Sequence, residues 1–380
     1  MGANRSRGGA VLPDGPARKN HGILRVALRA AAVLVALVGV LLFLAATGEG
    51  SGFGNLAWAI VASVLPVPLY LALALWIDRY EREPRLLLLW AFLWGATFAL
   101  FLSLALEVVL IEALLPAIFG PNSALANAIG GSVVPGAAEE GAKGLALLIL
   151  YLWKRNEFDG VIDGIVYAAM VGLGFAMIEN VEYYAGAIAR SGLSFELTFL
   201  LRGVLEPFLH PLMTALTGIG FGIASRATSR AARIGAPIAG LLAAMTVHSL
   251  WDYGALVGEG MAGIATNYLR IFLPLALLVV AFVAYGLSRE GRLVREHLRP
   301  ELQSGVLTQQ EYDSLGSVRG RITASLGALR QGYRPWRRRA RFAQVASELA
   351  FYRDRVGRGA TTVEVEKRDA AYVEALRNRA

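Results

Sequence analysis

The chain has 380 residues, of which 56% are hydrophobic and 17% are charged, whereas soluble domains carry about 25% charged residues. Apolar runs of about 20 residues recur along the chain, which excludes an ordinary soluble protein and predicts an all-α, polytopic membrane helical bundle. The absence of cysteine excludes disulfides, thiolate catalysis and cysteine-type zinc sites. The net charge of +8 resides in residues 289–380, which carry 19 Lys/Arg and 11 Asp/Glu.

The apolar runs predict about eight transmembrane helices. The predicted spans are residues 28–47, 57–77, 86–108, 132–153, 161–188, 199–225, 234–257 and 267–288. They divide the chain into a basic cytoplasmic segment (1–27), a membrane domain (28–288) and a basic soluble tail (289–380). We interpret the first apolar run as an uncleaved span, because it is long for the core of a signal peptide. Proline and glycine residues predict a loop over 108–131, with a short interfacial helix before it.

Lysine and arginine residues concentrate in alternate loops, and this bias predicts the orientation of the spans. The basic loops hold Arg79, Arg82, Arg85, Lys154, Arg155, Arg226, Arg230 and Arg233. The opposite loops hold Arg190 alone. Both termini are therefore expected in the cytoplasm, on the side of the basic loops.

Four of the predicted spans carry side chains that lipid disfavours. These are Glu139-Glu140-Gly-Ala-Lys143, Phe175-Ala-Met-Ile-Glu179, His210, and His248-Ser-Leu-Trp-Asp252. An ionisable group at the bilayer centre costs about 2.5–3.5 kcal/mol on insertion scales, so such groups usually face one another or a wet cavity. The predicted topology places all four motifs at or outside the midplane, so we expect them to meet in one polar pocket.

The spacings place related side chains on shared helix faces. Glu139 and Lys143 are four residues apart, as are His248 and Asp252, where the carboxylate can hold the imidazole in one tautomer. Phe175, Glu179 and Tyr183 repeat at the same interval, and so do His210 and Thr214. We interpret Arg202 and Glu206, also four apart, as a local ion pair, and leave the role of Asn180 open.

Two kinds of chemistry fit these residues. A buried carboxylate can act as a base towards water, with a neighbouring His or Lys stabilising an oxyanion. Alternatively, His210, His248 and a carboxylate such as Glu179 could bind Zn²⁺ with a water completing the site. The HExxH motif is absent, so the residues alone leave both readings open. Structural roles compete for some members: an ion pair for Lys143 and Glu139, packing for Phe175, an interfacial anchor for Tyr183, and helix–helix hydrogen bonding for His210.

Taken together in this order, the motifs resemble those of the PrsW family of intramembrane proteases. They are EExxK at 139–143, FxxxExxxY at 175–183, His210 followed by Thr214 and Gly218, and HxxxD at 248–252. The segment 78–85 also resembles the first cytoplasmic loop of that family, and the likeness covers about residues 65–290. PrsW proteins are similar to CAAX prenyl endopeptidases and to the scaffold subunit of γ-secretase.

The resemblance implies a protease of the bacterial plasma membrane that cleaves a membrane-anchored anti-sigma factor near its extracytoplasmic face. By position, Glu139 or Glu140 would activate water and His210 would assist or bind metal. His248 and Asp252 would stabilise the oxyanion or complete the site, with Lys143, Phe175 and Tyr183 in support. Glu179 stands where CAAX proteases have histidine, so their mechanism does not transfer directly. The family has been described as both metallo- and glutamate-type, which leaves zinc open.

The basic tail is expected to contact the membrane. The basic cluster Arg334–Arg341 predicts contact with anionic lipid, at about 1 kcal/mol per charge, and no nucleic-acid partner is expected. We expect two or three amphipathic helices in this tail.

Two rival functions are compatible with the polar residues. A non-catalytic scaffold would use the polar cluster to hold helices together. A proton-coupled transporter would also place Glu and His inside the membrane, but the two halves show no inverted repeat.

Overall fold

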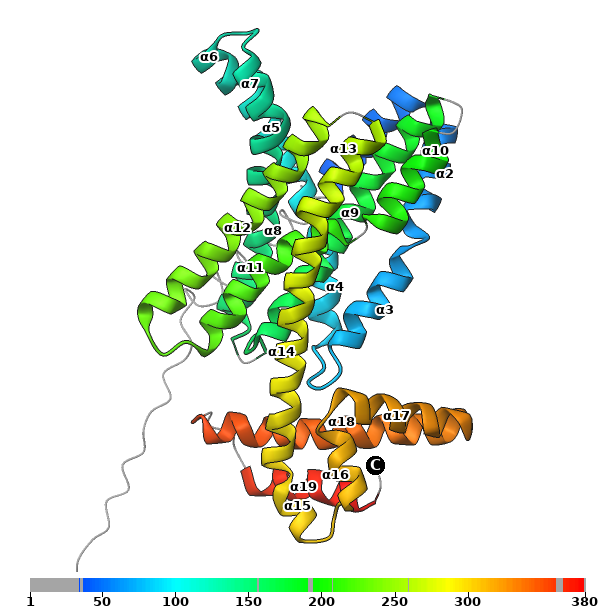
Figure 1. Cartoon of the computed structure of the whole chain (residues 1–380), viewed down its shortest axis with the longest axis vertical. Helices are drawn as coiled ribbons and strands as arrows, with labels where there is room; N and C mark the ends of the chain where they lie inside the picture. Colours follow the sequence, from blue (N-terminus) through cyan, green and yellow to red (C-terminus); the bar gives the residue numbers. More distant parts are fainter. Residues whose placement is uncertain are drawn as a thin grey trace, which may run out of the picture.

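The computed structural model describes residue 34 and residues 37–155, 157–190, 194–206, 208–258, 260–359 and 365–378. Within these residues every regular element is a helix, so the predicted all-α class is confirmed. The molecule is elongated, with a bundle of long helices at one end and a small helical tail domain at the other (Figure 1). A single helix, α14 (Leu273–His297), connects the two parts.

Six helices in the described part of the chain are long and apolar enough to cross a membrane. They are Phe53–Ile77, Arg85–Phe119, Val161–Ala189, Phe195–Arg226, Arg230–Val257 and Ala262–His297. Helix α8 (Val134–Trp153) corresponds to a further predicted span, 132–153, and carries Glu139, Glu140 and Lys143 within five residues. The first predicted span, 28–47, lies partly outside the described residues, and its second half belongs to the apolar helix Leu37–Ser51.

Proline and π-helical turns interrupt several of these spans. Pro66 separates α2 (Phe53–Val64) from α3 (Val67–Ile77), because a proline within a helix removes one backbone hydrogen bond. The third predicted span was expected to end at residue 108, and this is wrong. Helices α4 (Arg85–Trp94), α5 (Leu100–Val108) and α6 (Leu115–Phe119) follow one another through π-helical turns at Gly95–Ala99 and Val109–Leu114.

The helical run ends at Gly120, whose φ of 88° is a conformation that glycine adopts without strain. Helix α7 (Ala124–Ala128) then returns the chain into α8 through a π-helical turn at Ile129–Val133. Helices α5, α6 and α7 therefore form a projection at the end of the bundle farthest from the tail domain (Figure 1). The predicted loop over 108–131 is thus helical for most of its length.

Helices α9 (Val161–Ala189) and α11 (Leu209–Arg226) form the centre of the bundle. About 78% of the apolar window of each of their spans is buried, against 22–28% for the other four. Glycines allow this packing, because a Cβ on Gly164 would lie 2.0 Å from the carbonyl oxygen of Gly218. Helices α8 and α12 (Arg230–Val257) pack beside α11. Residues of the four helices α8, α9, α11 and α12 therefore face one another inside the bundle.

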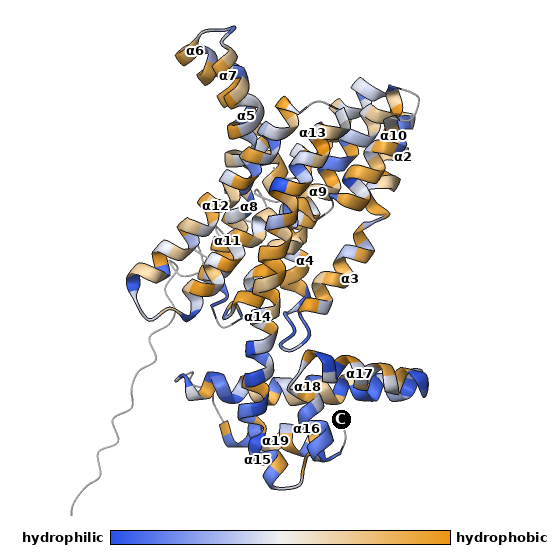
Figure 2. Ribbon diagram, viewed as in Figure 1, coloured by the Kyte–Doolittle hydropathy of each residue, from blue (hydrophilic) through white to orange (hydrophobic). Residues whose placement is uncertain are grey.

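The tail domain begins as a continuation of α14, which remains helical nine residues beyond the predicted end of its span. Figure 2 shows the change along α14 from hydrophobic to hydrophilic residues as it enters the tail. The tail contains α15 (Arg299–Gln303), α16 (Gln309–Leu315), α17 (Val318–Arg330), α18 (Tyr333–Gly357) and α19 (Val365–Arg377). The expected two or three helices were too few, because Gly305 and Gly332 create turns that divide the polar sequence further.

The tail packs against the bundle through one shared hydrophobic core. This core joins Tyr80, Phe158 and Tyr167 of the membrane domain to Leu298, Leu315 and Phe351 of the tail. Two short helices, α10 (Ser194–Thr198) and α13 (Gly260–Asn267), complete the opposite end of the bundle. The site-bearing helices are therefore held at one end by the tail.

Candidate active site

Four helices bring the ionisable motifs of the sequence together inside the bundle. Helix α8 contributes Glu139, Glu140 and Lys143, α9 contributes Glu179, α11 contributes His210 and Thr214, and α12 contributes His248. We call the six ionisable members of this set, all but Thr214, the site cluster. Glu140 and Lys143 are completely buried, and His248, His210 and Glu139 expose 3%, 6% and 7% of their surface. The expectation that these motifs meet inside the bundle is confirmed by their contacts.

The site cluster lies far from the tail. Asp159, immediately before α9, and Arg226, at the end of α11, bind each other at the tail end of the bundle. Glu179 lies 18 residues into α9, about 27 Å along the helix at 1.5 Å per residue. His210 lies 16 residues before Arg226, about 24 Å away by the same measure. The two central helices therefore place their site residues at the same depth, in the half of the bundle opposite the tail.

Lys143 lies at the centre of the site cluster. Its Nζ donates to Glu139 Oε2 at 2.8 Å and to Glu140 Oε1 at 3.0 Å, and it lies 2.9 Å from His210 Nδ1. The ammonium also sits 3.8 Å from the centre of the Phe175 ring, a cation–π contact. Because an ammonium group only donates hydrogen bonds, Nδ1 of His210 accepts, and the ring proton resides on Nε2. That Nε2 donates to Glu179 Oε2 at 2.9 Å.

Glu140 is held by three donors and orients the second histidine. Its Oε1 accepts from Lys143 and from Nδ1 of His248 at 3.2 Å, and its Oε2 accepts from Thr214 Oγ1 at 2.9 Å. The Nε2 of His248 therefore points to the other carboxylates, 3.8 Å from Glu139 Oε2 and 3.6 Å from Asp252 Oδ2. Glu140 thus fixes the tautomer of His248, a role that the sequence assigned to Asp252.

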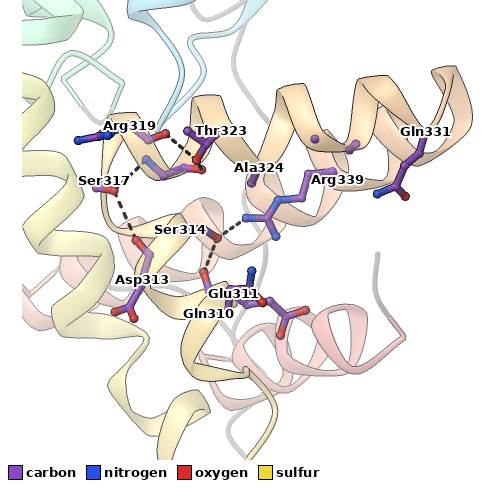
Figure 3. Close-up of a pocket in the computed structure, with 13 residues that line it drawn as sticks. Gln310, Glu311, Asp313, Ser314, Ser317, Arg319, Thr323, Ala324, Gln331 and Arg339 are labelled. Carbon is purple, nitrogen blue, oxygen red and sulfur yellow. Dashed lines mark hydrogen bonds between the residues drawn. The ribbon is translucent and has the colours of Figure 1, made fainter.

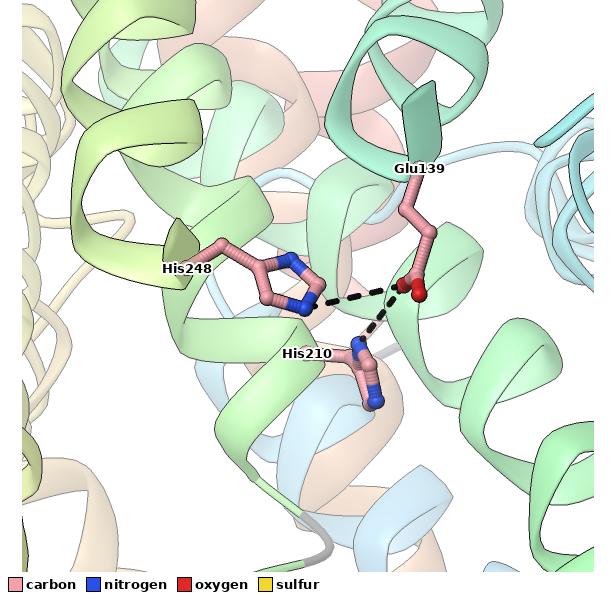
Figure 4. A group of neighbouring side chains, drawn as sticks. All are labelled: Glu139, His210 and His248. Atoms are coloured by element: carbon pink, nitrogen blue, oxygen red, sulfur yellow. Dashed lines mark ion pairs between the residues drawn. The ribbon is translucent and has the colours of Figure 1, made fainter. Parts of the chain in front are cut away.

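Glu139, His210 and His248 form a trio that could hold a metal ion. One ligand atom from each lies within 4.8 Å of the others, and Figure 4 shows the Glu139 carboxylate facing both imidazoles. Two histidines and one glutamate are a known zinc-binding set, and ligating histidines usually have their other ring nitrogen held by a carboxylate. Both histidines meet this condition, through Glu179 and Glu140. The donor set therefore fits zinc.

Glu179 has a different position from the one the sequence predicted. It was a candidate metal ligand, but the trio contains Glu139 in its place. Glu179 instead bridges Nε2 of His210 and the guanidinium of Arg202. Its carboxylate is therefore a partner that orients the histidine, with its charge compensated by arginine.

Arg202 belongs to the site, and the predicted local pair with Glu206 is wrong. The guanidinium of Arg202 forms an ion pair with Glu179, donates to Asn180 Oδ1 at 2.8 Å and stacks 3.5 Å from the centre of the Tyr183 ring. Glu206 instead accepts from Tyr268 Oη at 3.1 Å. The segment Phe199–Leu205 is π-helical, so residues four apart no longer share a face, and the sequence offered no signal of this.

The span that carries His210 is broken beside the site. The π-helical segment ends at Leu205, and α11 begins at Leu209, so His210 occupies the first turn of a new helix. Non-helical backbone at membrane depth is tolerated where protein buries it or where it lines a cavity. Tyr70 of α3 supports the break by donating to the carbonyl oxygen of Gly203 at 3.0 Å. His210 lies midway along its predicted span, as expected, but the helix is interrupted just before it.

The site cluster is most open near Glu179, Asp252 and Tyr183. The side chains of Glu179 and Asp252 expose 16% and 23% of their surface, and Tyr183 is 44% exposed. Among the described residues, Asp252 Oδ2 is buried without a hydrogen-bond partner. Glu107 of α5, which the sequence reading missed, lies within electrostatic range of Glu139, Glu179 and His248. An acceptor oxygen without a donor and several carboxylates therefore lie on the most exposed side of the site cluster.

These features define a class: a multi-pass helical membrane protein with a buried centre of glutamate, histidine and lysine suited to proton transfer or metal binding. Residues 83–285, more than half of the chain, match the family described as PrsW family intramembrane metalloprotease. The chain therefore belongs to the PrsW family.

Three curated relatives show how far the similarity extends. Protease PrsW of Clostridioides difficile is 43% identical over 108 residues, which is 28% of this chain and 42% of the relative. That of Geobacillus kaustophilus is 29% identical over 153 residues (40% of this chain, 60% of the relative). That of Bacillus subtilis is 28% identical over 181 residues (46% and 72%). The chain thus spans about half the length of the first two, and no solved structure matches it. With six apolar helices and bacterial relatives, it is a multi-pass protein of the bacterial cell membrane.

Proposed function

We propose that this protein is an intramembrane endopeptidase that hydrolyses a peptide bond of a membrane-anchored substrate. The observation that supports this proposal is the meeting of Glu139, His210 and His248 within 4.8 Å of one another inside a membrane bundle. Buried ionisable groups at membrane depth are costly and usually functional. The PrsW family description and the names of the relatives agree with this chemistry.

The contacts suggest a division of roles. Glu139 is the more accessible of the two neighbouring glutamates, with 10% of its side chain exposed against 0% for Glu140, so we assign it the contact with the attacking water. Glu140 holds Nδ1 of His248, which leaves Nε2 facing Glu139 and available as a ligand for a metal ion. Lys143 keeps a positive charge beside both glutamates and lowers the cost of burying them. Asp252, 3.6 Å from Nε2 of His248, is the second carboxylate beside this nitrogen.

Zinc is the proposed cofactor. Glu139, His210 and His248 would hold the ion, which when bound would polarise the scissile carbonyl and lower the pKa of a bound water. Glu179 and Glu140 would orient the two imidazoles. Lys143 contacts Glu139 Oε2 and His210 Nδ1, two atoms that would bind the ion. Its contact with Glu140 is therefore the one that it would keep when zinc is bound.

The side of cleavage follows from the charge bias of the loops. The basic loops and the tail share one end of the bundle, which the positive-inside rule assigns to the cytoplasm. The site cluster lies in the opposite half, so cleavage is proposed near the extracytoplasmic face. An anti-sigma factor with a single membrane span is the proposed substrate, and this choice rests on the family resemblance. Anionic lipid is the proposed partner of the tail.

A comparison of membrane proteomes tests the proposed activity. Cells would express the wild type, Glu139→Gln, or the control Glu112→Gln, which changes an exposed glutamate on the projecting helical run. We expect a truncated membrane protein, cut near its outer membrane boundary, with the wild type and with the control but not with Glu139→Gln. The same fragment in all three cultures, with all three proteins equally expressed, would contradict the proposal.

A further inference from the structure

The hairpin formed by α17 and the first turns of α18 is the most basic surface of the described chain. Residues 318–341 contain eight arginines and no acidic residue. The arginines are Arg319, Arg321, Arg330, Arg334, Arg337, Arg338, Arg339 and Arg341. A segment with this composition attracts anions strongly, and structure decides which of its charges remain available.

Two of the eight arginines are used inside the tail. Arg321 is buried, donates to Ser347 Oγ at 2.6 Å and lies 4.0 Å from the centre of the Tyr80 ring. Arg339 binds Ser314 of α16 across a groove of about 760 Å³, and Figure 3 shows its guanidinium turned towards that helix. The other six are exposed. The hairpin therefore presents six positive charges to its surroundings.

Large apolar side chains are exposed at the turn of the same hairpin. Leu326 and Leu329 near the end of α17 are 52% and 50% exposed. Tyr333 and Trp336 in the first turn of α18 are 64% and 36% exposed, with ring centroids 5.7 Å apart. Aliphatic and aromatic residues beside arginines are typical of helices that lie in a membrane interface.

The hairpin starts where the membrane spans end. Gly316, just before α17, packs so closely on α14 that a Cβ on Gly291 would lie 2.6 Å from its carbonyl oxygen. Gly291 is four residues beyond Leu287, the last apolar residue of the span, or about 6 Å along the helix. Arg321 also donates to the carbonyl oxygen of Arg79, two residues beyond the end of α3. The first turns of α17 are thus fixed at the membrane boundary from two sides.

The direction of the hairpin completes the geometry. In Figure 1, α17 and α18 run across the direction of α14, on the side of the tail domain nearest the bundle. They extend beyond the other helices of the tail domain. A helix pair perpendicular to a transmembrane helix lies parallel to the membrane plane. We propose that the α17–α18 hairpin is a peripheral anchor that binds the anionic phospholipid headgroups of the same membrane through its exposed arginines and the apolar residues at its turn. This proposal does not depend on proteolytic activity.

Because the chain has no cysteine, a single introduced thiol can report on the surroundings of the hairpin. Leu329→Cys in the full-length protein would carry a polarity-sensitive bimane probe, in phosphatidylcholine nanodiscs with or without phosphatidylglycerol. We expect a blue-shifted emission, quenched by doxyl-labelled lipid, only when phosphatidylglycerol is present. High salt should reverse the blue shift, because salt screens exposed charges. A probe at Ala370→Cys on α19 should respond to neither lipid.

Two charge-matched variants then locate the interaction. Arg334→Gln/Arg337→Gln/Arg338→Gln should raise the phosphatidylglycerol content needed for the shift, since each arginine contributes about fivefold to anionic-lipid binding. Arg299→Gln/Arg368→Gln/Arg377→Gln removes three exposed charges from α15 and α19 and should leave the response unchanged. Equal loss in both variants, no dependence on phosphatidylglycerol, or a shift produced by an oligonucleotide instead of lipid would overturn the proposal.

Discussion

Two networks of charged side chains, one inside the half of the bundle away from the tail and one at its tail end, differ in composition. The site cluster joins glutamates to histidines and a lysine, all on membrane helices. The second network, which we call the tail-facing network, joins arginines and Tyr167 to carboxylates of the loops that precede α4 and α9. Its contacts are Arg226–Asp159, Arg358–Asp159, Arg355–Glu81 and Tyr167–Glu83. Arginine remains protonated in proteins, whereas histidine gains and loses protons near neutral pH.

The two networks also differ in exposure. Lys143 is completely buried, whereas the side chains of Arg355 and Arg358 are 33% and 39% exposed. Charges that are fully buried must be compensated by their partners, and partly exposed ones are also solvated by water. The comparison therefore separates a centre suited to proton transfer or metal binding from a contact that docks the tail on the bundle.

The largest stability effect should come from the centre of the site cluster. Lys143→Met leaves Glu139 and Glu140 without their cation, and breaking a buried pair costs about 3–5 kcal/mol. Denaturation in detergent micelles would measure this loss. Lys154→Met, at the edge of the bundle, serves as the control and should change stability by less than about 0.5 kcal/mol. Equal stability of the two variants would mean that Lys143 does not compensate the buried glutamates.

A smaller effect is expected where a carboxylate orients a histidine. Glu179→Gln should reduce cleavage about 10–100-fold, because a neutral amide holds Nε2 of His210 less firmly and loses the ion pair with Arg202. Glu182→Gln, an exposed change on the same helix, is the matched control. Rates would be measured in proteoliposomes with the substrate that the proteome comparison identifies. Full activity of Glu179→Gln would remove this residue from the site.

The loop before α4, which carries Glu81 and Glu83 of the tail-facing network and also Asp78, should make stability depend on pH. Burial raises the pKa of Asp78 to about 8, and it also raises the pKa of Glu83 well above its usual range. An unfolded aspartate has a pKa of about 3.9, so the folded state binds more protons between these values and loses stability as pH rises through them. The melting temperature should therefore fall as pH rises from about 4 to about 8. Asp78→Asn should flatten this slope, and a slope of opposite sign would refute the assignment.

The smallest effect should come from the exposed arginines that dock the tail. Arg355→Gln and Arg358→Gln should each cost no more than about 1 kcal/mol, because water also solvates these side chains. Limited proteolysis of the tail would compare them with the wild type. Release of the whole tail by either single change would show that docking depends on one ion pair and not on the shared hydrophobic core.

The sequence predicted the membrane class and the meeting of the four motifs, because lipid leaves few places for buried charges. Glu139, His210 and His248 could be grouped from hydropathy and topology alone. The partner of Arg202 could not be predicted. The expected pair with Glu206 assumed that residues four apart share a helix face, and a π-helical segment changes this spacing. The ion pair of Glu81 with Arg355 joins residues 274 positions apart, and no local pattern reports such a contact.

The projection formed by α5 and α6 shows a different limit of the sequence. Proline and glycine predicted a loop there, but Pro116 occupies the first turn of α6, where a missing N–H costs nothing. Only Gly120 ends the helix. The predicted number of tail helices was too low for a related reason. The turns at Gly305 and Gly332 depend on backbone conformations that composition does not reveal.

The most direct test of the central claim compares a histidine of the site cluster with the histidine described in the tail. His248 belongs to the site cluster, and His297 faces Asp354 in the tail at 3.7 Å. Cleavage of the identified substrate would be measured in proteoliposomes for His248→Ala and His297→Ala, together with the bound zinc of each purified protein. We predict a loss of at least about 1,000-fold with His248→Ala, within the range of acid–base catalysis, and near-normal cleavage with His297→Ala. Equal cleavage by the two variants would contradict the assignment of the chemistry to the site cluster.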